Sequence, residues 1–365
     1  MRKLFFEAMA YVDDRYAYGS RVDKNMLCKV DMLTGECEYV SIFPMEDKNG
    51  ERLHMKALKY KNKIIFSPSA ANNVCIYDYI NNKFKMINVH QYEKNGANRK
   101  MKYSEIVLND EFAYVFPATY GDIIKINMET LMVENSISIS ENVPYIFRKD
   151  GLVRSEKLFL TSANSNVILE FDMKAENVKL HRIGQNNNGS WSICDDGENL
   201  WIIPYIFGSI VKWNPQTDTV SERFDCNEYF VKEKYMFMKA VVRENKIYAI
   251  PLYSELMMIL DMETGNIDWI NINENTDIVT NIYLVYIDNT VIFLGSKVKG
   301  RWIKEKDNSC FGWNLITNEI NEYNLCLKND GGEYMKDYFC LPVESMWEDE
   351  STLIDYISYL KKHNN

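Results

Sequence analysis

Charged side chains recur at one position of a sequence repeat in this chain, and together they could carry out chemistry. They are Glu7, Lys56, Glu105, Arg148 and Lys239. Two carboxylates beside cationic groups can divide the acid and base roles of catalysis if their pKa values separate, so Glu105 and Glu7 are the catalytic candidates. The same residues could instead bind a polar or charged small molecule or a peptide end, or form a solvated ring of structural salt bridges.

Aromatic residues close to predicted turns form a second group. Tyr120, Tyr205 and Tyr253 lie near turns, and Trp191 begins a repeat. Rings exposed on loops suit stacking against a sugar or a peptide side chain, and packing between repeats is the alternative. The predicted ligand-binding residues are therefore Lys56, Glu105, Arg148, Trp191, Lys239, Tyr120, Tyr205 and Tyr253.

Signatures of other chemistry do not occur in the sequence. The four histidines are His54, His90, His181 and His363, and no two have the H-x-H or H-E-x-x-H spacing of metal ligands. The G-x-S-x-G, Walker and G-x-G-x-x-G motifs do not occur. The acidic segment 195–199 (D-D-G-E-N) lacks the spacing of a calcium loop and indicates a turn. We therefore expect no metal and no cofactor.

A repeat organises the chain. Each copy has a large apolar residue, then Asp or Asn, then a short polar turn, and the interval ranges from 42 residues (Asp172 to Asn214) to 53 (Asp261 to Asn314). The seven Asp or Asn anchors are Asp31, Asp78, Asn127, Asp172, Asn214, Asp261 and Asn314. Seven copies at this interval are typical of β-propeller blades.

The residues before each anchor predict two further strands. Pro68, Pro117, Pro204 and Pro251 each end an apolar run ten residues before an anchor. Six residues before the anchors stand Asn25, Asn72, Gly121, Asn166, Gly208 and Glu255, and all but the last are types that tolerate positive φ in a tight turn. The anchor itself opens the next turn, where its side chain can accept from the backbone two residues on.

The predicted fold is therefore all-β, a seven-bladed propeller of four-stranded blades with a short C-terminal helix. Residues 1–345 form the propeller, whose first strands line a central channel and place the charged residues at one mouth. Residues 346–365 form a helix and tail that pack on the propeller or bind a partner. Trp201, Trp213 and Trp313 are expected in the sheet core.

Two anchor segments carry a family resemblance. The sequences L-D-M-E-T-G-N-I-D-W at 260–269 and V-D-M-L-T-G-E-C-E-Y at 30–39 resemble the D-x-x-T-G turn of quinoprotein-type and YVTN-type propeller repeats, and more loosely the kelch-like propellers. The resemblance implies the fold. Quinoprotein enzymes bind a quinone and calcium, and because this sequence offers no matching ligand set, no catalytic residue is carried over.

Composition and net charge narrow the range of partners and compartments that we expect for this protein. The 365 residues carry a net charge of −10, which argues against nucleic acid and anionic membranes as partners. Cysteines without C-x-x-C pairs and a start unlike a signal peptide indicate a cytoplasmic protein. We expect a monomeric scaffold that binds a protein, peptide or carbohydrate through one face and the channel mouth. The alternatives are a channel-sited lyase, cyclase or hydrolase, and a structural subunit of a larger complex.

Overall fold

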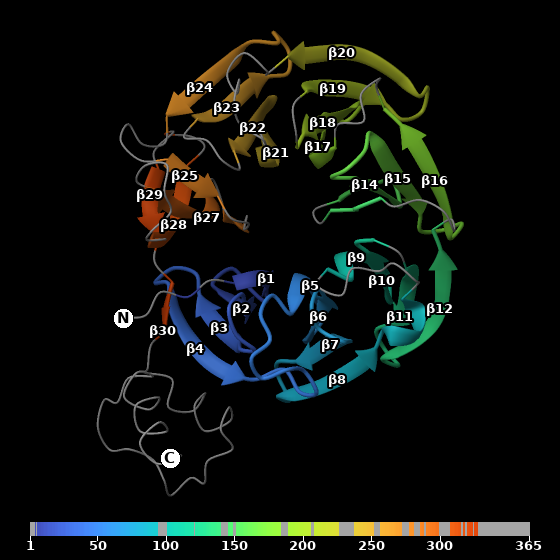
Figure 1. The fold of residues 1–365 in the computed structure, drawn as a ribbon, viewed down its shortest axis with the longest axis vertical. Helices are drawn as coiled ribbons and strands as arrows, with labels where there is room; N and C mark the ends of the chain where they lie inside the picture. The colour runs from blue at the N-terminus through green and yellow to red at the C-terminus, as the bar shows by residue number, and fades with distance from the viewer. Residues whose placement is uncertain are drawn as a thin grey trace, which may run out of the picture.

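The repeats fold as antiparallel sheets that surround a common axis in the computed structural model, so the predicted all-β propeller is confirmed (Figure 1). The structure describes residues 4, 6–93, 101–119, 121–139, 145–148, 151–183, 189–205, 208–225, 237–251, 256–271, 277–280, 285–287, 290–298, 307–314, 317, 320–323 and 325–327. The predicted helix within 346–365 and the side chain of Trp313 lie outside what is described. None of the described residues forms a helix long and apolar enough to cross a membrane.

Seven sheets, here called blades 1 to 7, follow one another along the described chain. Blade 1 contains β1 (Phe6–Tyr11), β2 (Tyr16–Arg21), β3 (Leu27–Asp31) and β4 (Glu36–Ser41). Blade 2 contains β5 (His54–Tyr60), β6 (Lys63–Pro68), β7 (Asn73–Asp78) and β8 (Lys83–Asn88), followed by the 3₁₀ turn η1 (His90–Tyr92). Blade 3 contains β9 (Tyr103–Asn109), β10 (Phe112–Pro117), β11 (Asp122–Asn127) and β12 (Met132–Ser138).

The later blades repeat this order. Blade 4 contains β13 (Leu152–Arg154), β14 (Lys157–Thr161), β15 (Val167–Asp172) and β16 (Asn177–Arg182). Blade 5 contains β17 (Ser190–Asp195), β18 (Leu200–Pro204), β19 (Ser209–Asn214) and β20 (Thr219–Asp225). Blade 6 contains β21 (Phe237–Arg243), β22 (Lys246–Pro251), β23 (Leu256–Asp261) and β24 (Ile267–Asn271). Blade 7 contains β25 (Asp277–Thr280), β26 (Val285–Ile287), β27 (Thr290–Val298), β28 (Asp307–Asn314) and β29 (Ile320–Tyr323).

The predicted anchors end the third strand of every blade, from Asp31 in β3 to Asn314 in β28. The anchor side chains accept hydrogen bonds from backbone N–H groups, as expected. Asp261 Oδ1, for example, lies 3.0 Å from Glu263 N and 2.8 Å from Thr264 N. The fourth residue after each of the first six anchors has positive φ, and it is glycine only at Gly35 and Gly265. Asn25, Asn72 and Asn166, where we expected positive φ, do not have it, because the loops there span several residues rather than a tight turn.

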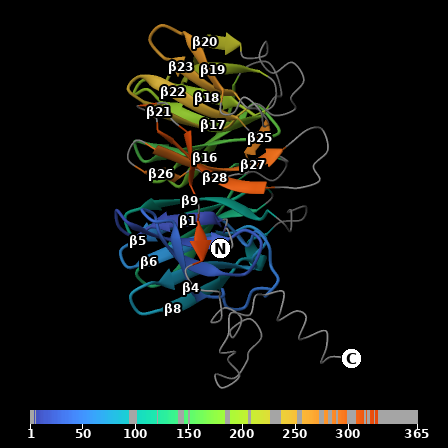
Figure 2. The ribbon, with the colours of Figure 1, turned by 90° about the vertical axis from the view of Figure 1, so that its left-hand side faces the viewer.

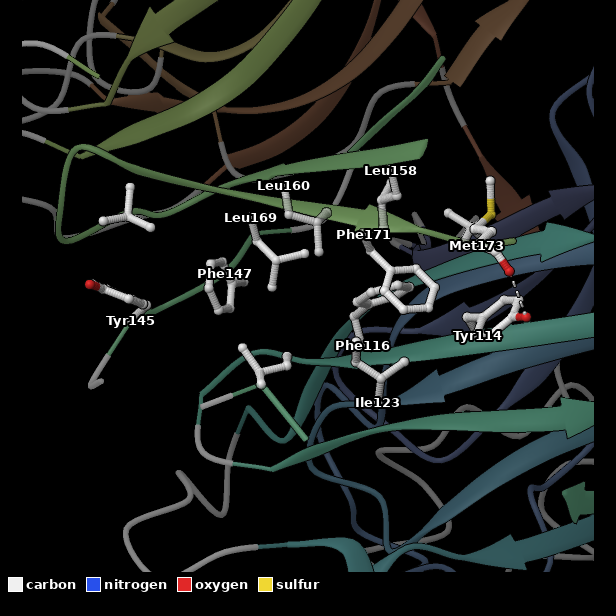
Figure 3. Packing of buried hydrophobic residues seen from close by; sticks show 13 residues of the cluster. Tyr114, Phe116, Ile123, Tyr145, Phe147, Leu158, Leu160, Leu169, Phe171 and Met173 are labelled. Atoms are coloured by element: carbon white, nitrogen blue, oxygen red, sulfur yellow. Dashed lines mark hydrogen bonds between the residues drawn. The ribbon is translucent and has the colours of Figure 1, made fainter. Parts of the chain in front are cut away.

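The apolar core lies between neighbouring blades. Figure 3 shows Phe116 and Tyr114 of blade 3 against Phe171 of blade 4, with ring centroids 5.3 and 5.1 Å from that of Phe171. Trp201 and Trp213 of blade 5 are fully buried, as predicted. Apolar clusters cover the sheets of blades 2 to 5 on both faces, so stacking the blades buries surface that a single blade could not.

The ring is closed by a strand from late in the sequence. β30 (Cys326–Leu327) pairs in parallel with β4, the outer strand of blade 1. Leu4 N donates to Leu325 O at 2.8 Å, and Cys326 N donates to Gly35 O at 2.9 Å. Figure 2 shows β30 beside β4 in the edge-on view. Blade 1 therefore combines strands from both ends of the described chain.

Candidate functional site

The first strands of the blades share an irregularity at the end of the axis where they begin, here called the top end. In blades 1, 2, 3, 5 and 6 the pairing of first and second strands shifts there by one residue, which is a β-bulge. In blade 4 an isolated bridge joins Phe147 to Ser162, and regular pairing resumes only at Leu152. Bulges change the direction of side chains and are common beside functional sites.

Proline at the end of the second strand accompanies four of these bulges. Pro68, Pro117, Pro204 and Pro251 pair with His54, Tyr103, Ser190 and Phe237, each of which directly precedes the shift. Proline has no N–H to donate. The residues that directly follow Pro68, Pro117 and Pro204 nevertheless donate across to the first-strand segment, at 2.7, 2.8 and 2.9 Å. Blade 1 has Arg21 at this position and still contains the bulge. The prolines predicted to end strands therefore also mark where the top end begins.

Most of the predicted charged residues lie at or beside these bulges. We define the bulge ring as the predicted residues at or beside the start of the first strands together with Ser192, namely Glu7, Lys56, Glu105, Arg148, Trp191, Ser192 and Lys239. The structure describes Tyr205 in the adjoining loop, whereas Tyr120 and Tyr253 lie outside the described residues.

Two ion pairs join the first three blades. Lys56 Nζ lies 2.6 Å from Glu105 Oε1, so the sequence-predicted Lys56 and Glu105 are brought together. Glu7 is held by a residue that was not among those predicted. Its carboxylate accepts two hydrogen bonds from Arg52, which stands two residues before β5. Arg52 Nη2 lies 2.9 Å from Glu7 Oε1, and Arg52 Nε lies 3.0 Å from Glu7 Oε2. Sequence reasoning missed Arg52 because it stands in a loop outside the repeat.

Glu105 is held by blade 4 as well. Its Oε2 accepts from Gly151 N at 2.7 Å and its Oε1 from Ile106 N at 2.8 Å. The residue is fully buried, and both carboxylate oxygens are engaged by donors. This geometry favours a supporting role for Glu105, which fixes the Lys56 ammonium and the start of blade 4, over direct contact with a ligand.

Blades 4 and 5 are joined by a stacked cation. The Arg148 guanidinium carbon lies 3.4 Å from the ring centroid of Trp191 and 6.0 Å from that of Tyr205. The two rings are themselves 4.3 Å apart, and Arg148 Nη1 lies 3.5 Å from Met101 Sδ of the loop before blade 3. Trp191 is only 5% exposed, so the expectation of an exposed ring at this position is corrected: its face is covered by Arg148.

The last described contact joins blades 5 and 6, where Ala240 N donates to Ser192 Oγ at 3.1 Å. Lys239, half-buried, precedes Ala240. Burial raises the pKa of the Cys194 thiol to about 12, and the positive charge of Lys239 partly offsets that effect. Polar contacts therefore run from blade 1 to blade 6 through consecutive blades at the top end.

The described histidines lie elsewhere or are buried. His54 is fully buried against Phe43 and Phe66, and burial lowers its pKa to about 3. His181 is buried in the outer strand β16, 2.7 Å from Glu170. Within the described residues, no group of three or more His, Cys, Asp or Glu side chains could hold a metal ion. Within the segment 195–199, Asp195 ends β17 and the other residues form the turn before β18, where Arg154 donates to Gly197 O at 2.8 Å.

The comparisons with known proteins concern the fold. No family model matches the chain, and no curated protein sequence matches it. A structure of streptogramin B lyase has a TM-score of 0.57 at 12% identity, covering 88% of this chain and 95% of that one. A catalytically inactive virginiamycin B lyase from Staphylococcus aureus with quinupristin has a TM-score of 0.62 at 12% identity, covering 80% and 92%.

A third similar structure is the extracellular domain of a hybrid two-component system protein from B. thetaiotaomicron, with a TM-score of 0.58 at 13% identity. It covers 90% of this chain and 41% of that one. At such identities the likeness shows the propeller fold alone.

Proposed function

We propose that this propeller is a binding scaffold that recognises a peptide, protein or glycan ligand through its top end. The observation that carries the proposal is the Arg148–Trp191–Tyr205 stack, which is built from two blades. Its Arg148 and Trp191 belong to the same bulge ring as the Lys56–Glu105 pair. Charged and aromatic groups fixed on rigid strands are typical of recognition sites, since little entropy is lost when a ligand binds them.

The proposal is tested with an array of defined peptides and glycans probed with the labelled protein. We expect wild-type binding to at least one class, and its loss in the double variant Lys239→Glu, Tyr205→Ala. The matched control is Arg223→Glu, Tyr79→Ala, which changes the same kinds of group on the outer strand β20 and beside the end of β7. Unchanged binding by the first double variant, or no wild-type binding to any peptide or glycan, would contradict the proposal.

A channel-sited enzyme is the second candidate, and the fold shared with two lyase structures is what favours it. Both carboxylates expected to do acid–base chemistry are buried, Glu7 beneath Arg52 and Glu105 beneath Lys56. We therefore expect incubation with quinupristin to give no product by mass spectrometry. A product whose formation is lost in Glu105→Gln, with folding intact, would favour the enzyme instead.

The proposal also includes the expectations that the protein is a cytoplasmic monomer and that its partners are neither nucleic acid nor membranes. The acidic composition supports the exclusion of anionic partners. Three buried thiols, Cys28, Cys75 and Cys194, whose pKa values are raised by burial, support a protein that keeps its cysteines reduced.

A further inference from the structure

A turn follows the third strand in each of the first six blades, and one position of this turn differs between blades. It is the second residue after the Asp or Asn anchor. In blades 3 to 6 this residue is polar, and the four residues are Glu129, Lys174, Gln216 and Glu263. In blades 1 and 2 it is a large apolar residue, Leu33 or Ile80, which is 71% or 70% exposed. Exposed apolar residues at equivalent turns of neighbouring blades indicate an interaction surface, because the turn itself does not require them.

The charge of blade 2 is opposite to that of the chain. Residues 54–88 contain six lysines and one acidic residue, Asp78, so this blade carries +5 in a chain of net charge −10. Four of the lysines are engaged by other side chains or by the backbone, and they are Lys56, Lys59, Lys61 and Lys63. Lys83 and Lys85, on the outer strand β8, are exposed and form no ion pair with any residue that the structure describes. These two positive charges follow Ile80 in the same hairpin.

The chain leaves the ring beside the first of these turns. β30 pairs with the first residues of β4, and Cys326 N donates to Gly35 O at 2.9 Å. Gly35 stands two residues after Leu33 in the same turn. Figure 2 shows β30 alongside β4. The sequence that follows Leu327 is therefore tethered at the outer edge of blade 1, and any contact that it makes there is intramolecular, which raises its effective concentration.

The sequence after β30 contains a segment whose chemistry matches this surface. Residues 350–362, which lie outside the described residues, are predicted to form a helix with one apolar face, made of Leu353, Ile354, Ile357 and Leu360. The stretch 344–355 contains five acidic residues and no basic residue, so its charge of −5 is equal and opposite to that of blade 2. The 25 residues between Leu327 and Leu353 can extend about 80 Å at about 3.3 Å per residue, which is enough to reach either blade.

We propose that residues 350–362 dock on the outer edge of blades 1 and 2. The apolar face of the segment covers Leu33 and Ile80, and its acidic residues lie beside Lys83 and Lys85, since complementary charge fixes the register of such a contact. A helix of this length is about 20 Å long, and sheets packed face to face are about 10 Å apart, so one helix can contact both blades. The anchor turns lie at the opposite end of the strands from the bulges. The inference therefore concerns a different surface from the proposed function and does not depend on it.

Hydrogen exchange of the full-length protein, followed by mass spectrometry, tests the docking. Amides of residues 352–360 should exchange at least about tenfold more slowly than in the free peptide 344–362, because a helix this short is marginal in water unless it packs against something. The protection should weaken as salt is added, since part of the attraction is between exposed charges. It should be the same at low and high protein concentration, as an intramolecular contact requires.

Variants then locate the surface. Ile80→Asp should remove most of the protection, and so should the double variant Lys83→Glu, Lys85→Glu. Adding Glu348→Lys and Glu350→Lys to the double variant should restore the protection, because the charges are again opposite, and a general loss of structure would not be rescued in this way.

The matched controls change the same kinds of residue on other blades. Met132→Asp replaces a residue of β12 that is 63% exposed, and Lys174→Glu, Lys179→Glu reverses two exposed lysines of blade 4. Both controls should leave the exchange of residues 352–360 unchanged. Circular dichroism and the melting temperature establish that each variant is folded.

Four outcomes would overturn the inference: residues 352–360 are not protected in the full-length protein, the protection survives both blade 2 variants, the controls lose it equally, or it rises with protein concentration. The last result would place the segment on a second copy of the chain instead. None of these outcomes bears on the proposed function, which is tested separately by ligand binding at the top end.

Discussion

Replacing Glu105 by glutamine tests the central contact of the top end. The carboxylate accepts three hydrogen bonds, from Lys56 Nζ, Ile106 N and Gly151 N, at 2.6, 2.8 and 2.7 Å. Glutamine has the same shape but only one acceptor oxygen. If that oxygen faces Lys56 and Ile106, the amide NH₂ faces the Gly151 N–H, and two donors oppose each other.

The expected cost follows from these contacts. Leaving the buried Gly151 N–H without an acceptor costs about 1–3 kcal/mol. Removing the partner of a buried ion costs about 3–5 kcal/mol, and because the Lys56 side chain is 20% exposed, water compensates part of that loss. We therefore expect Glu105→Gln to lower the free energy of unfolding by about 3 kcal/mol.

Urea unfolding, followed by tryptophan fluorescence, measures this cost and the coupling to Lys56. In a double-mutant cycle with Lys56→Met, the two losses should be non-additive by about 1–3 kcal/mol. The matched pair is Lys61 and Glu129, whose side chains are 61% and 48% exposed, and Glu129→Gln should cost less than about 1 kcal/mol. The reasoning is refuted if Glu105→Gln costs less than about 0.5 kcal/mol, or if the cycle is additive.

Three further perturbations test the closure, a buried histidine and a turn. Leu325→Ala should lower the free energy of unfolding by about 2–4 kcal/mol in urea titrations, because Leu325 is 4% exposed in the apolar cluster where the ring closes. An unchanged midpoint of the urea titration would contradict that closure. In the folded protein burial lowers the pKa of His54 to about 3, whereas in the unfolded chain the imidazole is protonated near pH 6.5. The free energy of unfolding of the wild type should therefore fall by about 2 kcal/mol between pH 8 and pH 5 relative to that of His54→Gln. Parallel pH profiles of the two proteins would disprove this. Gly265→Ala should lower the melting temperature, since φ is 74° there and the new Cβ would lie 2.9 Å from the Phe224 ring, whereas Gly197→Ala, at φ 94° but with no such neighbour, should lower it less.

The parts of the fold that could be predicted from sequence are those encoded by local, repeated residues. Each of the first six Asp or Asn anchors accepts hydrogen bonds from backbone N–H groups within three residues of itself, so its type and spacing reveal the end of a third strand. The strand-ending prolines act locally too, because the missing N–H limits what can pair with them. Counting back from the anchors therefore placed Lys56, Glu105 and Lys239 near the start of the first strands, whereas Arg148 lies ahead of β13.

The rest depends on contacts between residues far apart in sequence. The parallel pairing of Cys326 with Glu36 joins the ends of the described chain and has no local signal. Burial could not be predicted either: Glu7 and Lys56 are both charged, yet their neighbours place one inside and the other at the surface. Positive φ at Asn82, Leu131, Glu176 and Asp218 was missed because these residues are not glycine and follow their anchors by four positions.

The contrast between repeated and variable positions argues for where function lies. The anchor position is Asp or Asn in every blade because every blade needs the same turn, so it carries no information about a ligand. The residues at the bulges of blades 1, 2, 3, 5 and 6 differ instead, and they are Glu7, Met55 with Lys56, Ser104, Trp191 and Met238. A purely structural ring could use one residue type throughout, as the anchors nearly do. Residue types that differ from blade to blade at equivalent positions suit an asymmetric ligand, which is why we place the proposed binding site at the top end and not at the anchors.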